Sequence, residues 1–108
     1  MEAHDLDGIA ARLDASGRLF EEFIRSHDLS VALYRLPAGG TDPQSPHTED
    51  EVYHVVRGRA TIVVGEERRP VVPGSVVFVA AGVPHRFVDI AEDLSILVFF
   101  GPAAGSRG

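Results

Sequence analysis

Hydrophobic and polar residues divide the chain into one short helical segment followed by a series of strands. The apolar positions of the first segment have the i, i+3, i+4, i+7 spacing of one helix face: Leu6, Ile9, Ala10 and Leu13. Gly17 supplies a stop signal, whereas Gly8 weakens the pattern within the segment. The sequence therefore predicts a short helix within residues 1–17.

After Gly17 the pattern changes to short apolar runs, each bounded by glycine, proline or polar turn residues. These runs predict strands near residues 19–24, 29–36, 51–56, 59–64, 70–72, 75–80, 85–90 and 94–100. A long polar connection occupies residues 37–50, and the sequence GEERR at 65–69 is predicted to form a charged hairpin tip. So many short strands indicate an all-β sandwich or barrel.

Two of the predicted strands lack the alternation of a half-buried strand. The runs VVFVA (76–80) and ILVFF (96–100) are apolar at every position, which indicates strands covered on both faces. In a chain of 108 residues, a second copy of the chain is one source of such a cover. We therefore predict a homodimer.

Composition indicates one globular domain. The chain has 108 residues, of which 44% are hydrophobic and 24% charged, as in ordinary single-domain proteins. We divide it into a helical segment (1–17), a β-barrel (18–100) and a flexible C-terminal tail (101–108). No apolar run approaches the ~20 residues of a membrane span, and the start of the sequence lacks the pattern of a signal peptide. We therefore expect a cytoplasmic protein.

The residue types present also exclude several function classes. Cysteine is absent and all ten basic residues are arginine, which excludes disulfides, thiolate ligands and lysine Schiff bases. The net charge is −6, and no basic cluster is larger than Arg68-Arg69. Nucleic acids and anionic membranes are therefore not expected as partners.

The candidate chemistry lies around PHTEDEVYHVV, residues 46–56. Glu51 is the first inward residue of a predicted strand and shares a face with Tyr53. His54 falls on the opposite face, so we interpret it as a packed or interface histidine.

His47 and His85 both stand at predicted strand entrances, where a barrel presents side chains at its mouth. Four residues of straight strand between His47 and Glu51 would span about 13 Å, whereas ligands of one ion lie ~2.0–2.2 Å from it. A shared ion therefore requires the chain to turn between them, and the intervening residue types suit a polar turn. We expect Glu49 and Asp50 to be solvated in this turn and Glu51 to point inside.

An inward carboxylate in an apolar barrel is costly unless it is paired or bound to a metal. Two histidines and one carboxylate form the facial arrangement of non-haem Fe(II) sites, and this set also suits Zn, Mn, Ni or Co. Two interpretations stay open. His47, Glu51 and His85 form either a divalent metal site or a buried hydrogen-bonded network.

Two segments of the chain match sequence motifs of cupins. The first comprises Gly40, TDPQSP, His47, TED, Glu51, VYHVVR and Gly58; the second comprises Gly74, SVVFV, AAG, VP, His85, RFV and Asp89. Ala80 replaces the proline of the second motif, and Asp89 replaces its asparagine. The chain thus resembles a small single-domain cupin, which implies a double-stranded β-helix, or jelly-roll, barrel.

The first motif departs from the family at Ser45, where metal-binding cupins usually have a histidine. The resemblance therefore implies His47, Glu51 and His85 as metal ligands, one fewer than the usual four. Three alternatives stay open: water or substrate completes the coordination, Gln44 or Ser45 supplies a weak oxygen ligand, or the site holds no metal.

The resemblance leaves the activity open, because cupins include oxygenases, isomerases, decarboxylases and binding proteins. Our first hypothesis is a metal-dependent enzyme, oxygenase- or isomerase-like, that acts on a small organic molecule inside the barrel. The ion would be a Lewis acid or O₂ site, and Tyr53 an acid or orienting hydroxyl. The alternatives are a non-catalytic barrel that binds small molecules, and a purely structural dimeric barrel.

Overall fold

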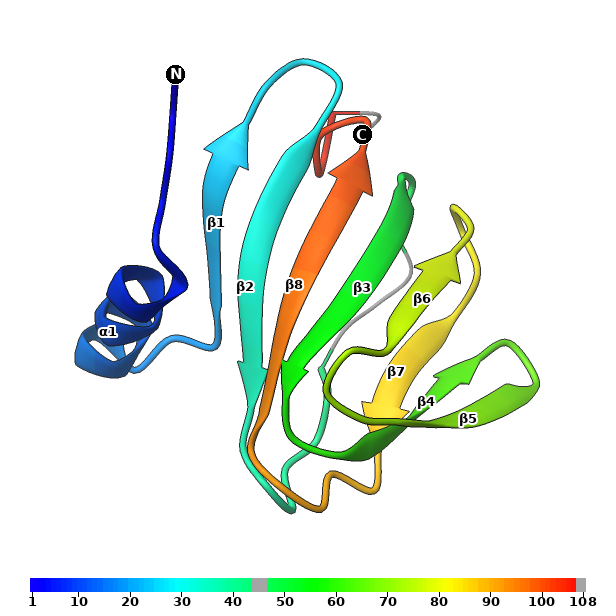
Figure 1. Cartoon of the computed structure of the whole chain (residues 1–108). Coiled ribbons are helices and arrows are strands. Elements are labelled where there is room, and N and C mark those ends of the chain that lie inside the picture. The colour runs from blue at the N-terminus through cyan, green and yellow to red at the C-terminus, as the bar shows by residue number, and fades with distance from the viewer. Residues whose placement is uncertain (44–46, 107–108) are drawn as a thin grey trace.

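The structure, a computed structural model, describes residues 1–43 and 47–106 and consists of one helix followed by eight strands (Figure 1). The elements in chain order are α1 (Leu6–Ser16), β1 (Phe20–Arg25), β2 (Ser30–Leu36), β3 (Asp50–Arg57), β4 (Ala60–Val64), β5 (Glu67–Val71), β6 (Val76–Val79), β7 (His85–Val88) and β8 (Leu94–Gly101). The mostly-β fold with a short N-terminal helix is thus confirmed.

The strands form two antiparallel sheets that face each other. One sheet has the order β1-β2-β8-β3-β6, and the other has the order β5-β4-β7 (Figure 1). The inward residues of both sheets form one core, with Tyr53, Phe87 and Ile96 among its most buried side chains. No strand pairing among the described residues joins the two sheets, so the fold is a two-layered jelly roll whose sheets are not closed into one barrel.

The charged hairpin tip is shorter than the sequence predicts. Only Gly65 and Glu66 form the turn, and Gly65 adopts a positive φ of 58°. Glu67 pairs with Val64, so the remaining residues of GEERR belong to β5. The prediction of a five-residue tip was wrong because charged residues are tolerated on an exposed edge strand.

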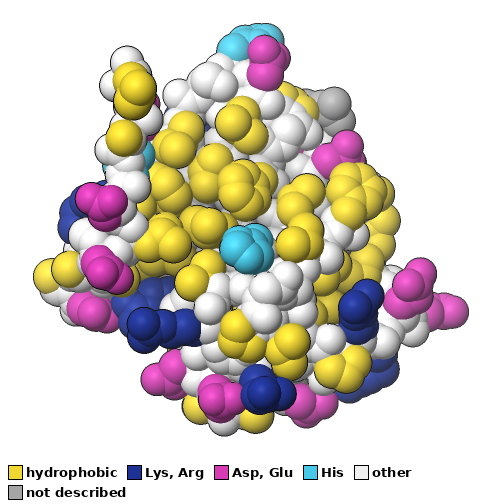
Figure 2. Space-filling view, in the orientation of Figure 1, with side chains coloured by type: hydrophobic (Ala, Val, Ile, Leu, Met, Phe, Trp, Pro, Cys, Tyr) yellow, Lys and Arg dark blue, Asp and Glu magenta, His cyan; other side chains and the backbone are white. Residues whose placement is uncertain are grey.

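The larger sheet has an outer face that is apolar over β8, β3 and β6. Two cross-strand rows make up this outer apolar face: Phe78–Val52–Phe99 and Val76–His54–Leu97. None of the six is an aspartate, glutamate, lysine or arginine, and Val76 and Phe78 are 65% and 61% exposed. Figure 2 shows hydrophobic side chains gathered on this side of the molecule with a histidine among them.

The sequence predicts that β6 and β8 are covered on both faces. Within one chain this holds only in part. Leu97 of β8 packs against the cluster formed by α1 and β2. The outer side of β6 carries no cover, as the exposure of Val76 and Phe78 shows. The homodimer stays a prediction.

Helix α1 is attached to the outer side of the larger sheet by its apolar stripe. Ile9 and Leu13 are buried and pack with Leu33 of β2. Gly17 ends the helix in the left-handed conformation, with φ 71°, and its N–H donates to the Leu13 carbonyl at 2.9 Å. This is the C-cap for which glycine is favoured, and it confirms the predicted stop.

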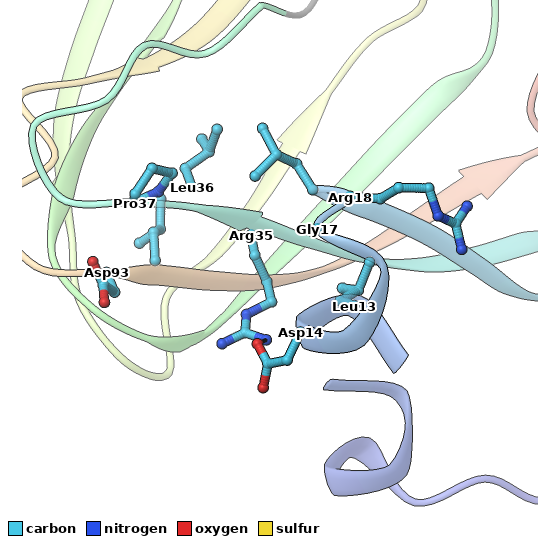
Figure 3. A pocket seen from close by; sticks show the side chains of 10 residues that line it. Leu13, Asp14, Gly17, Arg18, Arg35, Leu36, Pro37 and Asp93 are labelled. Atoms are coloured by element: carbon cyan, nitrogen blue, oxygen red, sulfur yellow. Dashed lines mark hydrogen bonds and ion pairs between the residues drawn. The ribbon is translucent and has the colours of Figure 1, made fainter. Parts of the chain in front are cut away.

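An arginine of the sheet also holds the helix. Arg35 of β2 extends to the last turns of α1, where it donates to Asp14 at 2.7 Å and to the Ala10 carbonyl at 3.2 Å. Figure 3 shows Arg35 and Asp14 pointing toward each other at the rim of a cavity of about 260 Å³. Arg35 and Asp14 neutralise each other at this rim, so their contact serves to attach α1 to the sheet.

The C-terminal residues are in contact with the fold up to the last described turn. Ala103 is buried, the Ala104 N–H donates to Ser30 at 2.9 Å, and the Gly105 N–H donates to Glu49 at 3.1 Å. Residues 103–105 are therefore held in place, in contrast to the flexible tail that we expected. The division of the chain into three segments otherwise stays a prediction.

No helix among the described residues has the length and apolar character needed to cross a membrane. The cytoplasmic location stays a prediction.

Candidate metal centre

The chain bends directly before β3, and this bend brings His47 back over the strand. Residues 48 and 49 form the bend, and β3 begins at Asp50. As a result, Nε2 of His47 lies 3.1 Å from Oε1 of Glu51. The turn that a shared ion requires is therefore present.

His85 reaches the same carboxylate from the other sheet. It is the first residue of β7, and its Nε2 lies 3.2 Å from Oε2 of Glu51. One ligand atom from each of His47, Glu51 and His85 lies within 4.8 Å of the other two. The structure thus brings together the three residues that the sequence singles out.

Backbone contacts fix the orientation of the His85 ring. Its Nδ1 lies 2.8 Å from the Val83 carbonyl, which makes Nδ1 the protonated nitrogen and leaves Nε2 directed at Glu51. The Gly82 N–H donates to the His47 carbonyl at 2.7 Å, so the loop before β7 is tied to the bend before β3. Such outer contacts are typical of metal-ligating histidines.

The buried polar atoms of this group lack hydrogen-bond partners. Glu51 and the His85 side chain are each about 1% exposed. Both carboxylate oxygens of Glu51 and Nε2 of His85 are at ion-pair distance, but none of them makes a hydrogen bond of ordinary geometry with a described residue. Buried polar atoms are rarely left in this state, so a metal ion, or a proton shared by His85 and Glu51, would complete the group.

The electrostatics of His85 are those of a histidine beside an anion. Burial lowers its pKa, but the Glu51 carboxylate, the Val83 carbonyl and the charge of Asp42 together raise it above its ordinary value. A cation is therefore favoured between these side chains, either as a proton on His85 or as a metal ion.

The distances are compatible with a shared metal ion. Ligand atoms at ~2.0–2.2 Å from an ion and at right angles to one another are about 3 Å apart. The separations of 3.1 Å and 3.2 Å around Glu51 agree with this value. The three residues therefore fit a divalent metal with a facial set of two imidazoles and one carboxylate.

One carboxylate of the bend differs from the prediction. Glu49 is only 2% exposed, and it accepts hydrogen bonds from Thr48 and from the Gly105 N–H. The expectation that Glu49 is solvated was wrong, because the C-terminal turn folds over it. Asp50 is exposed as expected and accepts a hydrogen bond from the Ala81 N–H at 2.9 Å.

The remaining candidates lie at different distances from the centre. Tyr53 is fully buried on the Glu51 side of β3, with its ring 5.9 Å from that of His85. His54 is half-buried on the opposite face, as predicted. Gln44 and Ser45, the possible additional ligands, lie outside the described residues.

Sequence reasoning missed Asp42, which lies in the long polar connection. Its two carboxylate oxygens accept one hydrogen bond from the Tyr34 hydroxyl at 2.6 Å and one from the Phe87 N–H at 2.9 Å. Asp42 thereby connects β2 of one sheet with β7 of the other. Burial, the hydrogen bond to Asp42 and its charge all raise the pKa of Tyr34, so its hydroxyl stays a donor. The only signal in the sequence is an aspartate beside proline, which is common in turns.

Comparison with known proteins identifies the family. Residues 32–100 match the family described as Cupin domain. An uncharacterized protein of Streptomyces coelicolor, SCO3923, is 51% identical over 102 residues, which are 94% of this chain and 97% of that protein.

Two solved structures are also similar. The TT1209 protein from Thermus thermophilus has 28% identity and a TM-score of 0.74 over 95% of this chain and 99% of that chain. The DMSP lyase DddQ from Ruegeria pomeroyi has 28% identity and a TM-score of 0.66 over 70% of this chain, which spans only 39% of the lyase chain. Since the family match extends from β2 to β8 and includes all three residues of the candidate metal centre, this chain belongs to the cupin domain family.

Proposed function

We propose that this cupin binds one divalent metal ion through His47, Glu51 and His85 and acts as a metal-dependent enzyme on a small organic molecule between the two sheets. One observation carries the proposal. Three buried polar atoms, Oε1 and Oε2 of Glu51 and Nε2 of His85, lack hydrogen-bond partners of ordinary geometry among the described residues. Fe, Mn, Ni, Zn and Co all suit this ligand set.

The residues around the centre would perform distinct tasks. The metal would supply Lewis-acid or O₂ chemistry when bound. Glu51 and the two histidines would hold the ion, and water or substrate would complete its coordination. Tyr53 is buried with its ring 5.9 Å from the His85 ring, and we propose that its hydroxyl orients a substrate or transfers a proton. We propose an oxygenase- or isomerase-like reaction, and similarity to a lyase extends the range of reactions to be tested.

The alternative is a barrel that binds a small molecule without turnover. It is favoured by the ligand count, because only three metal-ligating side chains come together among the described residues. In that case ligand binding would be equally strong with and without a chelator.

Metal reconstitution tests the proposal. Protein purified without metal is loaded in turn with each of the five ions, and the bound metal is measured by elemental analysis after gel filtration. We expect one ion per chain, and loss of that ion in His85→Ala. His54→Ala is the matched control, because this histidine lies on the other face of β3. Absence of stoichiometric binding for every ion would contradict the proposal.

We also propose that a second copy of the chain covers the outer apolar face, and that the protein is a homodimer. The face has no aspartate, glutamate, lysine or arginine, whereas the chain as a whole has a net charge of −6, so this is the surface on which two copies repel each other least. The face extends over β8 and β3 to the edge strand β6, where two copies would make a self-complementary contact about a two-fold axis.

Analytical ultracentrifugation at micromolar concentration tests the dimer. We expect a dimer for the wild type and a monomer for Phe78→Asp, because a carboxylate on this face would be buried without a partner. Val72→Asp, which changes an exposed apolar residue outside the two rows, should leave the dimer intact. A monomeric wild type would contradict the proposal.

A further inference from the structure

The two lateral gaps between the sheets differ in how they are bridged. On one side, Asp42 connects Tyr34 of β2 to the backbone of Phe87 in β7. On the other side, β6 pairs only with β3, and β5 pairs only with β4, among the strands that the structure describes. A cavity of about 290 Å³ lies between β5 and β6, and Val76 and Phe78 of the outer apolar face are among the residues that line it. Figure 1 shows these two strands at the same edge of the molecule.

The inner wall of this cavity is apolar and belongs to the core. Ile62 is buried, and Val64 and Val77 pack against the same core cluster. All three line the cavity. Val64 pairs with His85 in the register of β4 and β7, so the inner end of the cavity lies beside the candidate metal centre.

Two charged residues of β5 lie on the same side of the sheet as this apolar surface. Arg69 is the cross-strand partner of Ile62, and Glu67 is the partner of Val64. Cross-strand partners project to the same side of a sheet, so both charged side chains point to the inner side of the gap, and both line the cavity. In Figure 2, basic side chains lie beside hydrophobic ones at the edge of the molecule where β5 and β6 are found.

The two adjacent arginines of β5 have different environments. Arg68 also lines the cavity, but it is the cross-strand partner of Val63 and lies 3.4 Å from Asp89. Arg69 forms no ion pair or hydrogen bond with any described residue, and the same is true of Glu67. A cation that points toward an apolar concave wall without a partner has the arrangement of a ligand-binding pocket, in which few polar groups orient an apolar molecule.

We propose that the cavity between β5 and β6 binds a small carboxylic acid with an apolar tail. The guanidinium of Arg69 binds the carboxylate, because its planar donors match the two oxygens of that group. The tail lies on Ile62, Val64 and Val77. Glu67 weakens the interaction, because its negative charge lies on the same strand face, two residues from Arg69. Binding here does not require the metal, and the proposal therefore goes beyond the function proposed above.

The test uses hexanoate as the probe and hexanamide as its uncharged counterpart. The full-length protein is titrated with each compound in the presence of a chelator, and binding is followed by ¹⁵N–¹H NMR. We expect hexanoate to shift the amide resonances of Ile62, Val64 and Val77, and hexanamide to bind more weakly by about tenfold. Equal binding of the two compounds would overturn the proposal, and so would hexanoate binding that appears only after metal is added.

Charge-matched variants identify the residue that recognises the carboxylate. Arg69→Gln should weaken hexanoate binding by about tenfold, whereas Arg86→Gln, with the same change in net charge but on β7 and outside the cavity lining, should leave it unchanged. Glu67→Gln should strengthen binding about two- to threefold. Equal effects of the two arginine substitutions would overturn the proposal. Failure of metal binding would not alter these results, so the two proposals are tested separately.

Discussion

Replacing Glu51 by glutamine is expected to abolish tight metal binding. Glu51 supplies the only carboxylate of the candidate centre and lies between both histidines. Glutamine keeps the size of the side chain but removes the negative charge, so the affinity for a divalent ion should fall by ~100-fold or more. Because the side chain is about 1% exposed, no solvent interaction compensates for the change.

Thermal unfolding measures this loss directly. An ion present at 100 times its dissociation constant stabilises a protein by ~2.7 kcal/mol, which corresponds to ~10–20 °C in the melting temperature of a domain of about 100 residues. We expect a shift of this size for the wild type with metal and almost none for Glu51→Gln. Asp50→Asn is the control, since Asp50 is the adjacent carboxylate but is exposed and bonded to Ala81. A Glu51→Gln variant that keeps the full shift would show that the carboxylate is not a ligand.

The centre was predictable as far as it depends on strand alternation and motif spacing. Alternation places Glu51 inside and His54 outside, and the structure confirms both positions. Glu49 was not predictable, because its burial depends on Gly105, which is 56 residues away in the sequence. Asp42 was missed for the same reason, since its partner Phe87 lies 45 residues further along the chain.

The positions of the helix and strands were predictable from the sequence, but the order of the strands in the two sheets was not. Turn residues and apolar runs give the helix and each of the strands to within a few residues. They do not indicate that β8 lies between β2 and β3, or that no described strand pairing closes the β5–β6 gap. Those features depend on which residues meet across the two sheets, and local patterns carry little information about such contacts.

Substituting Gly58 by alanine is expected to cost about 3 kcal/mol or more of the free energy of unfolding. Gly58 has a φ of 91°, a conformation that costs any other residue backbone strain. A Cβ at this position would also meet the backbone carbonyl of Asp93 and would lie 2.9 Å from Cα of Leu94. The obstacle is backbone at the start of β8, so no side-chain rotation removes it. A domain of this size has only ~5–15 kcal/mol of stability in total.

Alanine substitutions at two other glycines distinguish the effect of backbone strain from that of steric conflict. Gly74 has a similar φ of 94°, but a Cβ there would have nothing within 4 Å, so Gly74→Ala should cost only ~1–2 kcal/mol. Gly8 lies in α1 with open space around it, and Gly8→Ala should stabilise the protein by up to ~1 kcal/mol because alanine favours the helix. Urea unfolding of the three variants should therefore rank Gly58→Ala as the least stable and Gly8→Ala as the most stable. If Gly58→Ala costs no more stability than Gly74→Ala, the steric conflict with the start of β8 is not a reason for glycine at position 58. The positive φ alone would then explain it.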